Sequence, residues 1–226
     1  MIKIINLSKT YGNIKVLKNI NLELDEGKIY GIVGENGAGK TTLFNCIAGI
    51  ETYKGKIETG FASLKDHLGF LQTESYFFSK ITGREYIQLL STARGKKVEA
   101  IKEKNIFDLP LNKYAVTYST GMKKKLALTA LLLQDNDVFI FDEPFNGVDI
   151  QSNIIITEII LKLKELKKTI IISSHIFSTL SDVCDEIHLL KEGAFIKRVY
   201  TEGFDKLAKE MKAITITNRI DRLNLV

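Results

Sequence analysis

The chain has few of the residues that mark disulfide-rich or disordered proteins, with two cysteines and two prolines in 226 residues. Cys46 and Cys184 are far apart in the sequence, and no CxxC pair or His–Cys cluster accompanies them. This spacing predicts neither a disulfide framework nor a cysteine metal site, and it suits a reducing compartment. Both cysteines lie in apolar, helix-like stretches, so we expect buried thiols. With 45% hydrophobic and 26% charged residues, the composition is otherwise that of a globular protein.

The chain also lacks the pattern of a membrane span and that of a nucleic-acid-binding surface. Its longest apolar helical run, LALTALLL, is far shorter than the roughly 20 residues that cross a bilayer. The opening MIKIINLSKTYG has no continuous apolar core of a secretory signal. The net charge of +5 comes mostly from lysines spread along the chain, without a dense basic block. We therefore expect no membrane insertion and no nucleic-acid partner.

Strand-like and helix-like segments alternate along most of the sequence. Three strands are expected within residues 2–34, separated by the turn signals YGN and DEG. VFIFDE at 138–143 and TIIISSH at 169–175 are short continuous apolar runs, which are typical of parallel strands buried on both faces. The alternation predicts an α/β fold with a mostly parallel central sheet.

We expect a single domain that spans all 226 residues. Its core would comprise residues from about 1 to 72 and from about 135 to 203. The helical pattern of residues 73–134, which includes an expected helix over 98–107, interrupts the alternation and predicts an inserted α-helical subdomain. Residues 204–226 are expected to form a helix and a short C-terminal tail.

The strongest motif lies between a predicted strand and a predicted helix, and it matches the pattern G-x-x-x-x-G-K-[ST]. Its glycines let successive backbone N–H groups curl around phosphate oxygens, and the following helix directs its positive end at the same phosphates. Lys40 adds a full charge near the β- and γ-phosphates, and the Thr41 hydroxyl can ligate Mg²⁺. The motif predicts a nucleoside-triphosphate site formed by Gly34, Glu35, Asn36, Gly37, Ala38, Gly39, Lys40, Thr41 and Thr42.

Two acids end the apolar run VFIFDE. Carboxylates at the end of a buried strand are costly unless they have a partner. Beside a phosphate-binding loop, Asp142 would hold Mg²⁺ through water, and Glu143 would polarise an attacking water. A solvated strand end is the alternative. Glu143 is the more informative of the two acids, because it distinguishes a hydrolase from P-loop proteins that only bind a nucleotide or transfer its phosphoryl group.

Two further polar residues end predicted strands. His175 closes TIIISSH, next to the acid-bearing strand and at the edge where the ligands of open α/β sheets collect. We expect it to contact a γ-phosphate, although a histidine at a strand end can also be structural. Gln72 ends the expected strand HLGFLQ, and its neutral amide could touch both the metal and the attacking water.

Over nearly its whole length the chain resembles the nucleotide-binding subunit of the ABC ATPases. The resemblance implies a P-loop core with an N-terminal antiparallel β subdomain, and it implies ATP and Mg²⁺ as ligands. The family's markers occur in the family's order: Tyr11 looks like the aromatic residue that stacks on adenine, Val16 lies beside the base, Gly34 to Thr42 match the Walker A loop, Gln72 the Q-loop, Asp142 and Glu143 Walker B, Asp149 the D-loop and His175 the H-loop.

Residues 118–125, YSTGMKKK, fall where the family carries its LSGGQ signature. Taken alone they are a helix start with Ser119 or Thr120 as N-cap, followed by lysines that we expect to form a solvated face. In the family, two subunits meet head to tail, and the signature of one caps the γ-phosphate bound by the other. Ser119 and Gly121 keep the hydroxyl and the N–H of such an anion site, whereas Thr120 and Met122 depart from the pattern and resemble efflux-type signatures.

The resemblance implies an ATP-hydrolysing subunit that powers a membrane transporter, with the signature type favouring export. Its implied partners are a second ABC ATPase subunit, identical or different, and a separate membrane-spanning permease. The chain would then be cytoplasmic and peripheral on the inner face of the cell membrane. The alternative is an ABC ATPase that acts in cofactor assembly or on ribosomes or DNA. A P-loop kinase would not explain the signature, Glu143 and His175 together.

Overall fold

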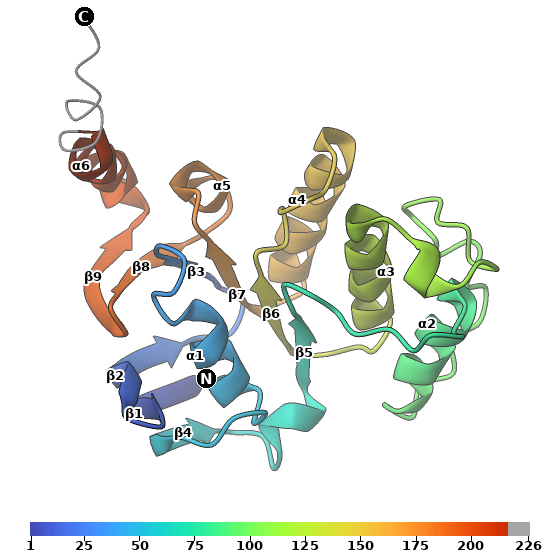
Figure 1. Ribbon diagram of the computed structural model, residues 1–226, viewed down its shortest axis with the longest axis horizontal. Coiled ribbons are helices and arrows are strands. Elements are labelled where there is room, and N and C mark those ends of the chain that lie inside the picture. Colours follow the sequence, from blue (N-terminus) through green and yellow to red (C-terminus); the bar gives the residue numbers. More distant parts are fainter. Residues whose placement is uncertain (217–226) are drawn as a thin grey trace, which may run out of the picture.

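Two β-sheets form the frame of the molecule, and the computed structural model describes it over residues 1–216 (Figure 1). A three-stranded antiparallel sheet has the order β2-β1-β4, and a six-stranded sheet has the order β5-β6-β7-β3-β8-β9. The pairs β5–β6, β6–β7, β7–β3 and β3–β8 are parallel, and only β9 runs antiparallel to its neighbour. The strands are β1 (Ile2–Tyr11), β2 (Ile14–Leu24), β3 (Ile29–Val33), β4 (Lys54–Thr59), β5 (Leu68–Leu71), β6 (Val138–Asp142), β7 (Thr169–Ser174), β8 (Glu186–Lys191) and β9 (Ala194–Tyr200).

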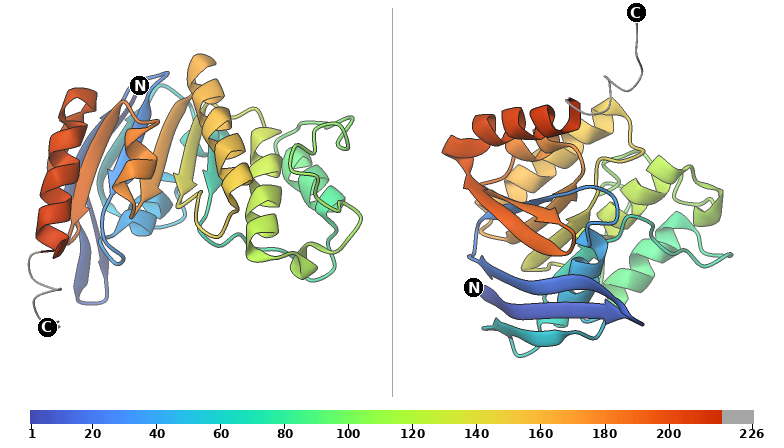
Figure 2. Two further views of the ribbon diagram at one scale, coloured as in Figure 1. Left: turned by 90° about the horizontal axis from the view of Figure 1, so that it is seen from above. Right: turned by 60° about the vertical axis from the view of Figure 1, so that its left-hand side comes forward.

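The helices lie on both faces of the six-stranded sheet (Figure 2). Helix α1 packs between the two sheets, where its apolar residues share a core with β1, β2 and the central strands. The helices α3, α4, α5 and α6 contribute to a second core on the opposite face. The α-helices are α1 (Lys40–Ile47), α2 (Gly83–Thr92), α3 (Thr120–Leu132), α4 (Ile150–Glu165), α5 (Phe177–Ser181) and α6 (Phe204–Ile216).

The predicted fold class is confirmed. The continuous apolar runs at 138–142 and 169–174 form the central strands β6 and β7, and every residue of both strands is buried. Strand β5 ends at Leu71, one residue before Gln72. The expected tail beyond residue 216 lies outside the described residues.

The helix expected over 98–107 is wrong. This segment forms turns between α2 and the 3₁₀ turn at Ala115–Thr117. Gly95 and Ala100 both have positive φ, which a right-handed helix cannot accommodate. In addition, the Asn105 side chain accepts from the backbone N–H of Leu109, a local bond that competes with helix propagation.

Along the described residues 1–216, none of the helices combines the length and the apolar character of a membrane span. Cys46 and Cys184 are both free and buried, as expected.

Candidate functional site

The phosphate-binding loop joins the end of β3 to the start of α1. Gly34 is needed because a Cβ there would lie 2.5 Å from the carbonyl oxygen of Leu190. Gly39 has φ +109° and sits against Leu17, so a side chain would be both strained and crowded. As the N-cap of α1, Gly39 has no side chain with which to cap the helix. The first N–H groups of α1 are therefore available to an anion.

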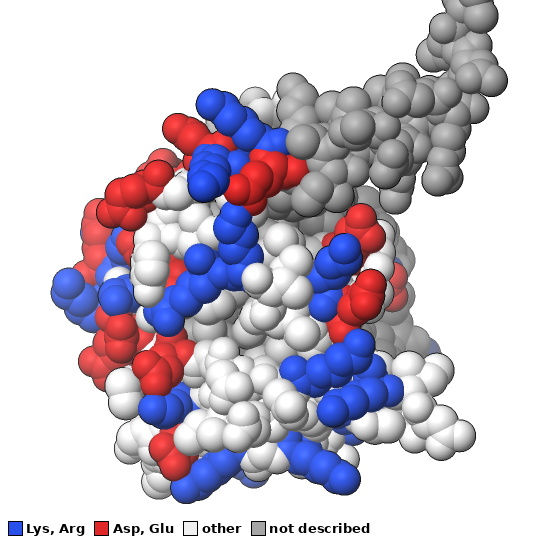
Figure 3. Space-filling model, turned by 90° about the vertical axis from the view of Figure 1, so that its left-hand side faces the viewer, with Lys and Arg blue, Asp and Glu red and all other residues white. Residues whose placement is uncertain are grey.

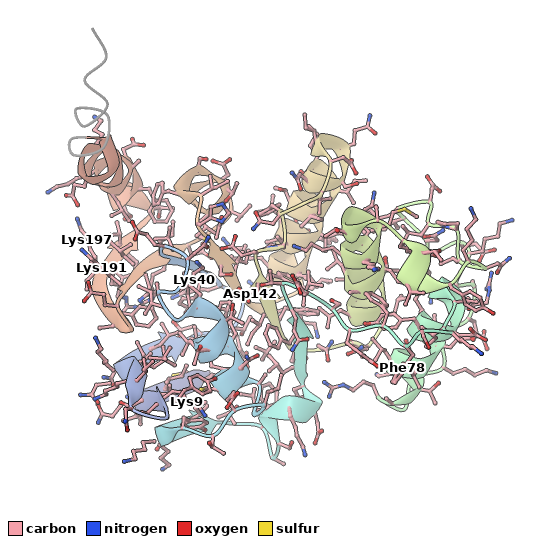
Figure 4. All side chains as sticks on the ribbon, in the orientation of Figure 1. Lys9, Lys40, Phe78, Asp142, Lys191 and Lys197 are labelled. Carbon is pink, nitrogen blue, oxygen red and sulfur yellow. The ribbon has the colours of Figure 1, made fainter. Side chains whose placement is uncertain are left out.

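Lys40 points from α1 toward the acids at the end of β6. Its side chain is buried, and the ammonium donates to the carbonyl oxygens of Gly34 at 2.7 Å and Glu35 at 3.3 Å. The same nitrogen lies 3.4 Å from the Glu143 Oε1 atom. Figure 4 shows Lys40 at the start of α1 and Asp142 at the end of β6. A buried cation and two buried acids thus converge on the phosphate-binding loop.

Asp142 is fully buried, and three hydroxyl groups donate to its carboxylate. Thr41 donates to Oδ2 at 2.6 Å, Thr73 donates to Oδ2 at 2.8 Å, and Ser173 donates to Oδ1 at 2.5 Å. These bonds satisfy a charge that would otherwise be costly to bury. The sequence predictions missed Thr73 and Ser173. Their position was the available signal, because Thr73 follows Gln72 and Ser173 lies two residues before His175.

Glu143 follows Asp142 with an unusual backbone. Its φ of +51° lies in the left-handed region, which a glutamate rarely adopts. Its N–H donates to the Ser173 hydroxyl at 2.9 Å. The carboxylate Oε2 lies 3.0 Å from the Nδ1 atom of His175 and accepts from Asn146 at 3.3 Å. Oε1 is buried 3.4 Å from the Lys40 ammonium and makes no hydrogen bond within the described part of the chain.

Tyr11 and Val16 lie at the rim of the loop. The Tyr11 ring is 42% exposed, and the Lys9 ammonium lies 4.7 Å from its centroid, held there by an ion pair with Glu51. Burial, followed by Glu51, raises the pKa of the Tyr11 phenol above its ordinary value. Val16 is half-buried next to Gly39. An aromatic face near the phosphate-binding loop can stack on a base.

Gln72 lies between the phosphate-binding loop and the helical region. On one side it lines a hollow of about 320 Å³ together with Thr41 and Thr73. On the other side it lines a groove of about 410 Å³, whose walls include Tyr76, Leu90 and Leu131. A single side chain therefore faces both the candidate metal site and the groove.

The signature residues are not brought to the phosphate-binding loop of the same chain. Strands β5 and β6 lie between α1 and α3 (Figure 1). Ser119 is the N-cap of α3, and its hydroxyl accepts from the Met122 N–H at 3.2 Å. A Cβ at Gly121 would lie 2.6 Å from the carbonyl oxygen of Gly147, so this glycine allows the loop after Glu143 to approach α3. Thr120 lies exposed beside it.

The expected solvated lysine face is wrong at Lys124 and Lys125. Lys124 is 5% exposed and points inward to the loop after Glu143, the Lys125 side chain is 14% exposed, and Lys123 is half-buried. Lys125 donates to Asp149 at 3.1 Å. Asp149, the predicted D-loop residue, is the N-cap of α4 and accepts from the Ser152 N–H at 2.9 Å.

The oxygen groups near the loop fit Mg²⁺. The Thr41 hydroxyl and the Asp142 carboxylate are in contact, and Gln72 lines the same hollow as Thr41. Mg²⁺ prefers few protein oxygens together with water and substrate phosphates. Within residues 1–216, no group of three or more His, Cys, Asp or Glu side chains forms a metal site of its own.

The fold and this loop define a P-loop nucleotide-binding protein, and comparisons with known proteins specify its family. The family model "ABC transporter" matches residues 17–146, more than half of the chain. The bacitracin transport ATP-binding protein BcrA of Enterococcus faecalis is 34% identical over 86% of this chain and 67% of its own length. The lantibiotic transport ATP-binding protein SrtF of Streptococcus pyogenes is 31% identical over 92% of this chain and 94% of its own.

A solved structure supports the fold. A dimeric ATP-binding cassette in a post-hydrolysis state, bound to ADP and Pi, superposes with a TM-score of 0.80 at 21% identity, over 89% of this chain and 99% of that chain. The chain belongs to the ABC transporter family as an ATP-binding subunit, and it is an ATPase that hydrolyses ATP for transport.

Proposed function

We propose that this chain drives an exporter by ATP-dependent closure of a head-to-tail dimer of two ATPase subunits. The observation that carries the proposal is the convergence of Lys40, Glu143 and His175 on the phosphate-binding loop. A carboxylate held by a histidine and lying near a phosphate-binding lysine is the arrangement that a hydrolase needs.

In this proposal the loop residues 34–42 bind the phosphates, and Tyr11 and Val16 contact the base. The Glu143 carboxylate accepts the proton of the attacking water, while His175 holds its Oε2 atom and contacts the γ-phosphate. Thr41, Asp142 and Gln72 would hold Mg²⁺, partly through water. The bound ion supplies charge neutralisation at the β- and γ-phosphate oxygens.

The position of the signature supports a second subunit. Ser119, Thr120, Gly121 and Met122 stand at the N-terminus of α3, away from the loop of their own chain. The N-terminus of a 13-residue helix favours an anion, so we assign it to the ATP held by the other subunit. Asp149 lies nearby at the start of α4 and would face the same junction.

The permease partner would dock on the groove beside Gln72. Apolar side chains are exposed around it, including Ile50 at 58% and Tyr76 at 72%, and Phe78 projects near α2 at 53% (Figure 4). An exposed apolar rim around a groove fits a helical segment of a partner. We further propose that residues 73–134 act as a helical subdomain and that the chain is cytoplasmic, peripheral on the inner membrane face. Export is favoured by the signature type and by the two transport proteins named above.

The catalytic assignment is tested by Glu143→Gln. Gln keeps the size of the side chain but cannot accept the proton, so hydrolysis should fall by roughly 10²–10⁴-fold while ATP binding persists. The variant should also accumulate as a closed dimer with ATP on gel filtration. Glu158→Gln, an exposed change on α4, is the matched control. Unchanged turnover in Glu143→Gln would remove Glu143 from the mechanism.

The docking assignment is tested by capturing the chain from its native membrane. A multi-span protein should co-purify with the wild-type chain and be lost with Tyr76→Asp. Tyr200→Asp, at an exposed tyrosine on β9, should leave the capture unchanged. A complex that contains only water-soluble partners would contradict the transporter role.

A further inference from the structure

Lys124 is a buried lysine whose contacts the ATPase site described above does not require. It lies in the second turn of α3, five residues after the N-cap Ser119, and its side chain is 5% exposed. The ammonium donates to the carbonyl oxygen of Glu143 at 2.6 Å and to that of Asn146 at 3.0 Å. Lys124 therefore contacts the backbone of the residue whose carboxylate faces His175.

This placement is costly in solvation terms. A buried ammonium whose hydrogen bonds go to carbonyl oxygens has no directly paired counter-charge. Burial lowers the pKa of Lys124, whereas the nearby carboxylates of Glu143 and Asp142 act to raise it. Within the described residues the Lys124 ammonium finds its hydrogen-bond partners in the loop after Glu143, so its burial fixes α3 to that loop.

The contacts fix Glu143 from two directions. From β7, the Ser173 hydroxyl accepts the N–H of Glu143. From α3, Lys124 binds the carbonyl oxygen of the same residue, and the Asn146 N–H also donates to it at 3.3 Å. Because Glu143 adopts φ +51°, both peptide groups must be held for its carboxylate to keep its direction toward His175.

The other end of this connection is the signature. Gly121 packs against the carbonyl oxygen of Gly147, one residue beyond Asn146, so the start of α3 and the loop after Glu143 are in close contact. Lys124 adds a charged contact between the same two segments. These contacts would carry a displacement of the N-terminus of α3 to the backbone of Glu143.

We propose that Lys124 is a positioning residue that links the two ATP sites of the dimer, because it ties the helix that contacts the partner's nucleotide to the backbone of this chain's own Glu143. The inference rests on the proposed head-to-tail dimer. It adds that engagement of the signature at one site aligns the base at the other.

The first test uses Lys124→Met, which keeps the length and apolar stem but has no donor. The turnover number should fall by roughly tenfold to a hundredfold, because the carboxylate loses its alignment. The KM for ATP should change by less than about twofold, since the phosphate-binding loop is untouched. Lys124→Arg, which retains donors, should recover part of the turnover, and Lys123→Met on the same helix turn should behave as wild type.

Melting temperatures measured alongside identify a folding defect. Should Lys124→Met not fold, Lys124→Gln takes its place, because its shorter amide reaches at most one of the two carbonyls and should lower turnover in the same way. A turnover of Lys124→Met within about twofold of wild type would overturn the proposal. Equal losses in Lys124→Met and Lys124→Arg would overturn it as well.

The second test distinguishes a link between the two ATP sites from an effect of Lys124 on its own site alone. In mixed dimers, one subunit carries Ser119→Ala, either alone or together with Lys124→Met, and single-turnover hydrolysis is measured at that subunit's own Glu143. The Ser119→Ala change should slow this step when Lys124 is present and have no further effect when it is replaced. Equal slowing in both backgrounds would refute the link. Normal hydrolysis in Glu143→Gln would instead reject the proposed function itself.

Discussion

Ser173 shows how much of this site depends on single hydroxyl groups. Its Oγ atom donates to the carboxylate of Asp142 and accepts the N–H of Glu143, so one buried side chain orders two consecutive acids. Apolar strand β7 brings this hydroxyl next to β6, because Ser173 pairs with Asp142 in the parallel register.

Replacing Ser173 by Ala should therefore affect both stability and catalysis. The variant leaves a buried N–H and a buried carboxylate oxygen with one partner fewer, which costs about 1–3 kcal/mol of unfolding free energy. ATP hydrolysis should also slow, because Glu143 loses one of its backbone anchors. Urea unfolding and steady-state turnover provide the measurements, with the exposed Ser178→Ala as control. Equal behaviour of the two variants would contradict this role.

At the scale of elements, the turn between β8 and β9 supports the phosphate-binding loop. The Gly193 N–H donates to the carbonyl oxygen of Ala38 at 3.1 Å, and its own carbonyl accepts from Lys18 at 2.8 Å. Gly193 has φ +80°, and a Cβ there would lie 2.1 Å from the carbonyl oxygen of Val16. The hairpin, the loop and β2 meet at this one glycine.

Gly193→Ala should weaken ATP binding as well as the fold. Its matched control is Gly95→Ala, which has a similar φ of +65° but no atom within 4 Å of the added Cβ. Both variants carry the strain of a positive φ, while only Gly193→Ala adds overpacking, typically about 1–3 kcal/mol more. Denaturant titration and ATP titration would detect the difference. Comparable losses in the two variants would show that the turn does not support the loop.

Helix α4 carries a pH-dependent cap. Hydrogen bonds from the Ser152 backbone and hydroxyl, and then from Lys125, hold the pKa of Asp149 well below its ordinary value of about 3.9. The ionised form is thus favoured by folding. Its stabilisation is present above the ordinary pKa and is lost as the pH falls through that range toward the folded-state pKa.

Asp149→Asn removes this dependence but keeps a good N-cap. The wild-type chain should be more stable than the variant at about pH 6, and the difference should shrink toward about pH 3. Urea unfolding at both pH values measures it. A difference that stays constant with pH would mean that the charge of Asp149 does not stabilise α4.

At the scale of the whole molecule, the thiols of Cys46 and Cys184 lie on opposite faces of the six-stranded sheet. Cys46 belongs to the core between the sheets, and Cys184 belongs to the core under α4 and α5. Burial raises the pKa of Cys46 to about 11, and it raises that of Cys184 as well. Both thiols should be unreactive in the native state, because the thiolate is the reactive form.

Single-thiol chains made by Cys46→Ala or Cys184→Ala should therefore react with a thiol reagent only on opening. In the Glu143→Gln background, ATP at about 100 times its dissociation constant should slow labelling by about 100-fold. The slowing should be equal for both thiols if the two cores open together. Slowing at Cys46 alone would show that the face bearing Cys184 opens independently.

The sequence predicted the elements whose signals are local. Strands β6 and β7 are continuous apolar runs. In the loop at 34–42, the spacing of the glycines and the lysine is one that few structures other than a phosphate-binding loop require. The helix predicted over residues 98–107 is absent because Gly95, Ala100 and Asn105 impose turns, which the spacing of apolar residues does not reveal.

The missed residues depend on partners distant in the sequence. Thr73 and Ser173 acquire their contacts from the order of the strands, and Lys124 from the loop after Glu143. A lysine among lysines at a helix start resembles a surface residue until the packing is known. The roles assigned to the site residues stay predictions for the variants above to test.

The edges of the six-stranded sheet have a consequence for the protein in a crowded cell. One edge strand, β5, is four residues long, and the other, β9, carries Lys197 and Arg198, paired with Glu210 of α6 and Glu186 of β8. On the face shown in Figure 3, basic and acidic side chains lie close together along the left and upper parts of the surface. Short or charged edges discourage the strand-to-strand pairing that begins aggregation. Both edges of the six-stranded sheet therefore oppose pairing with the same sheet of another copy.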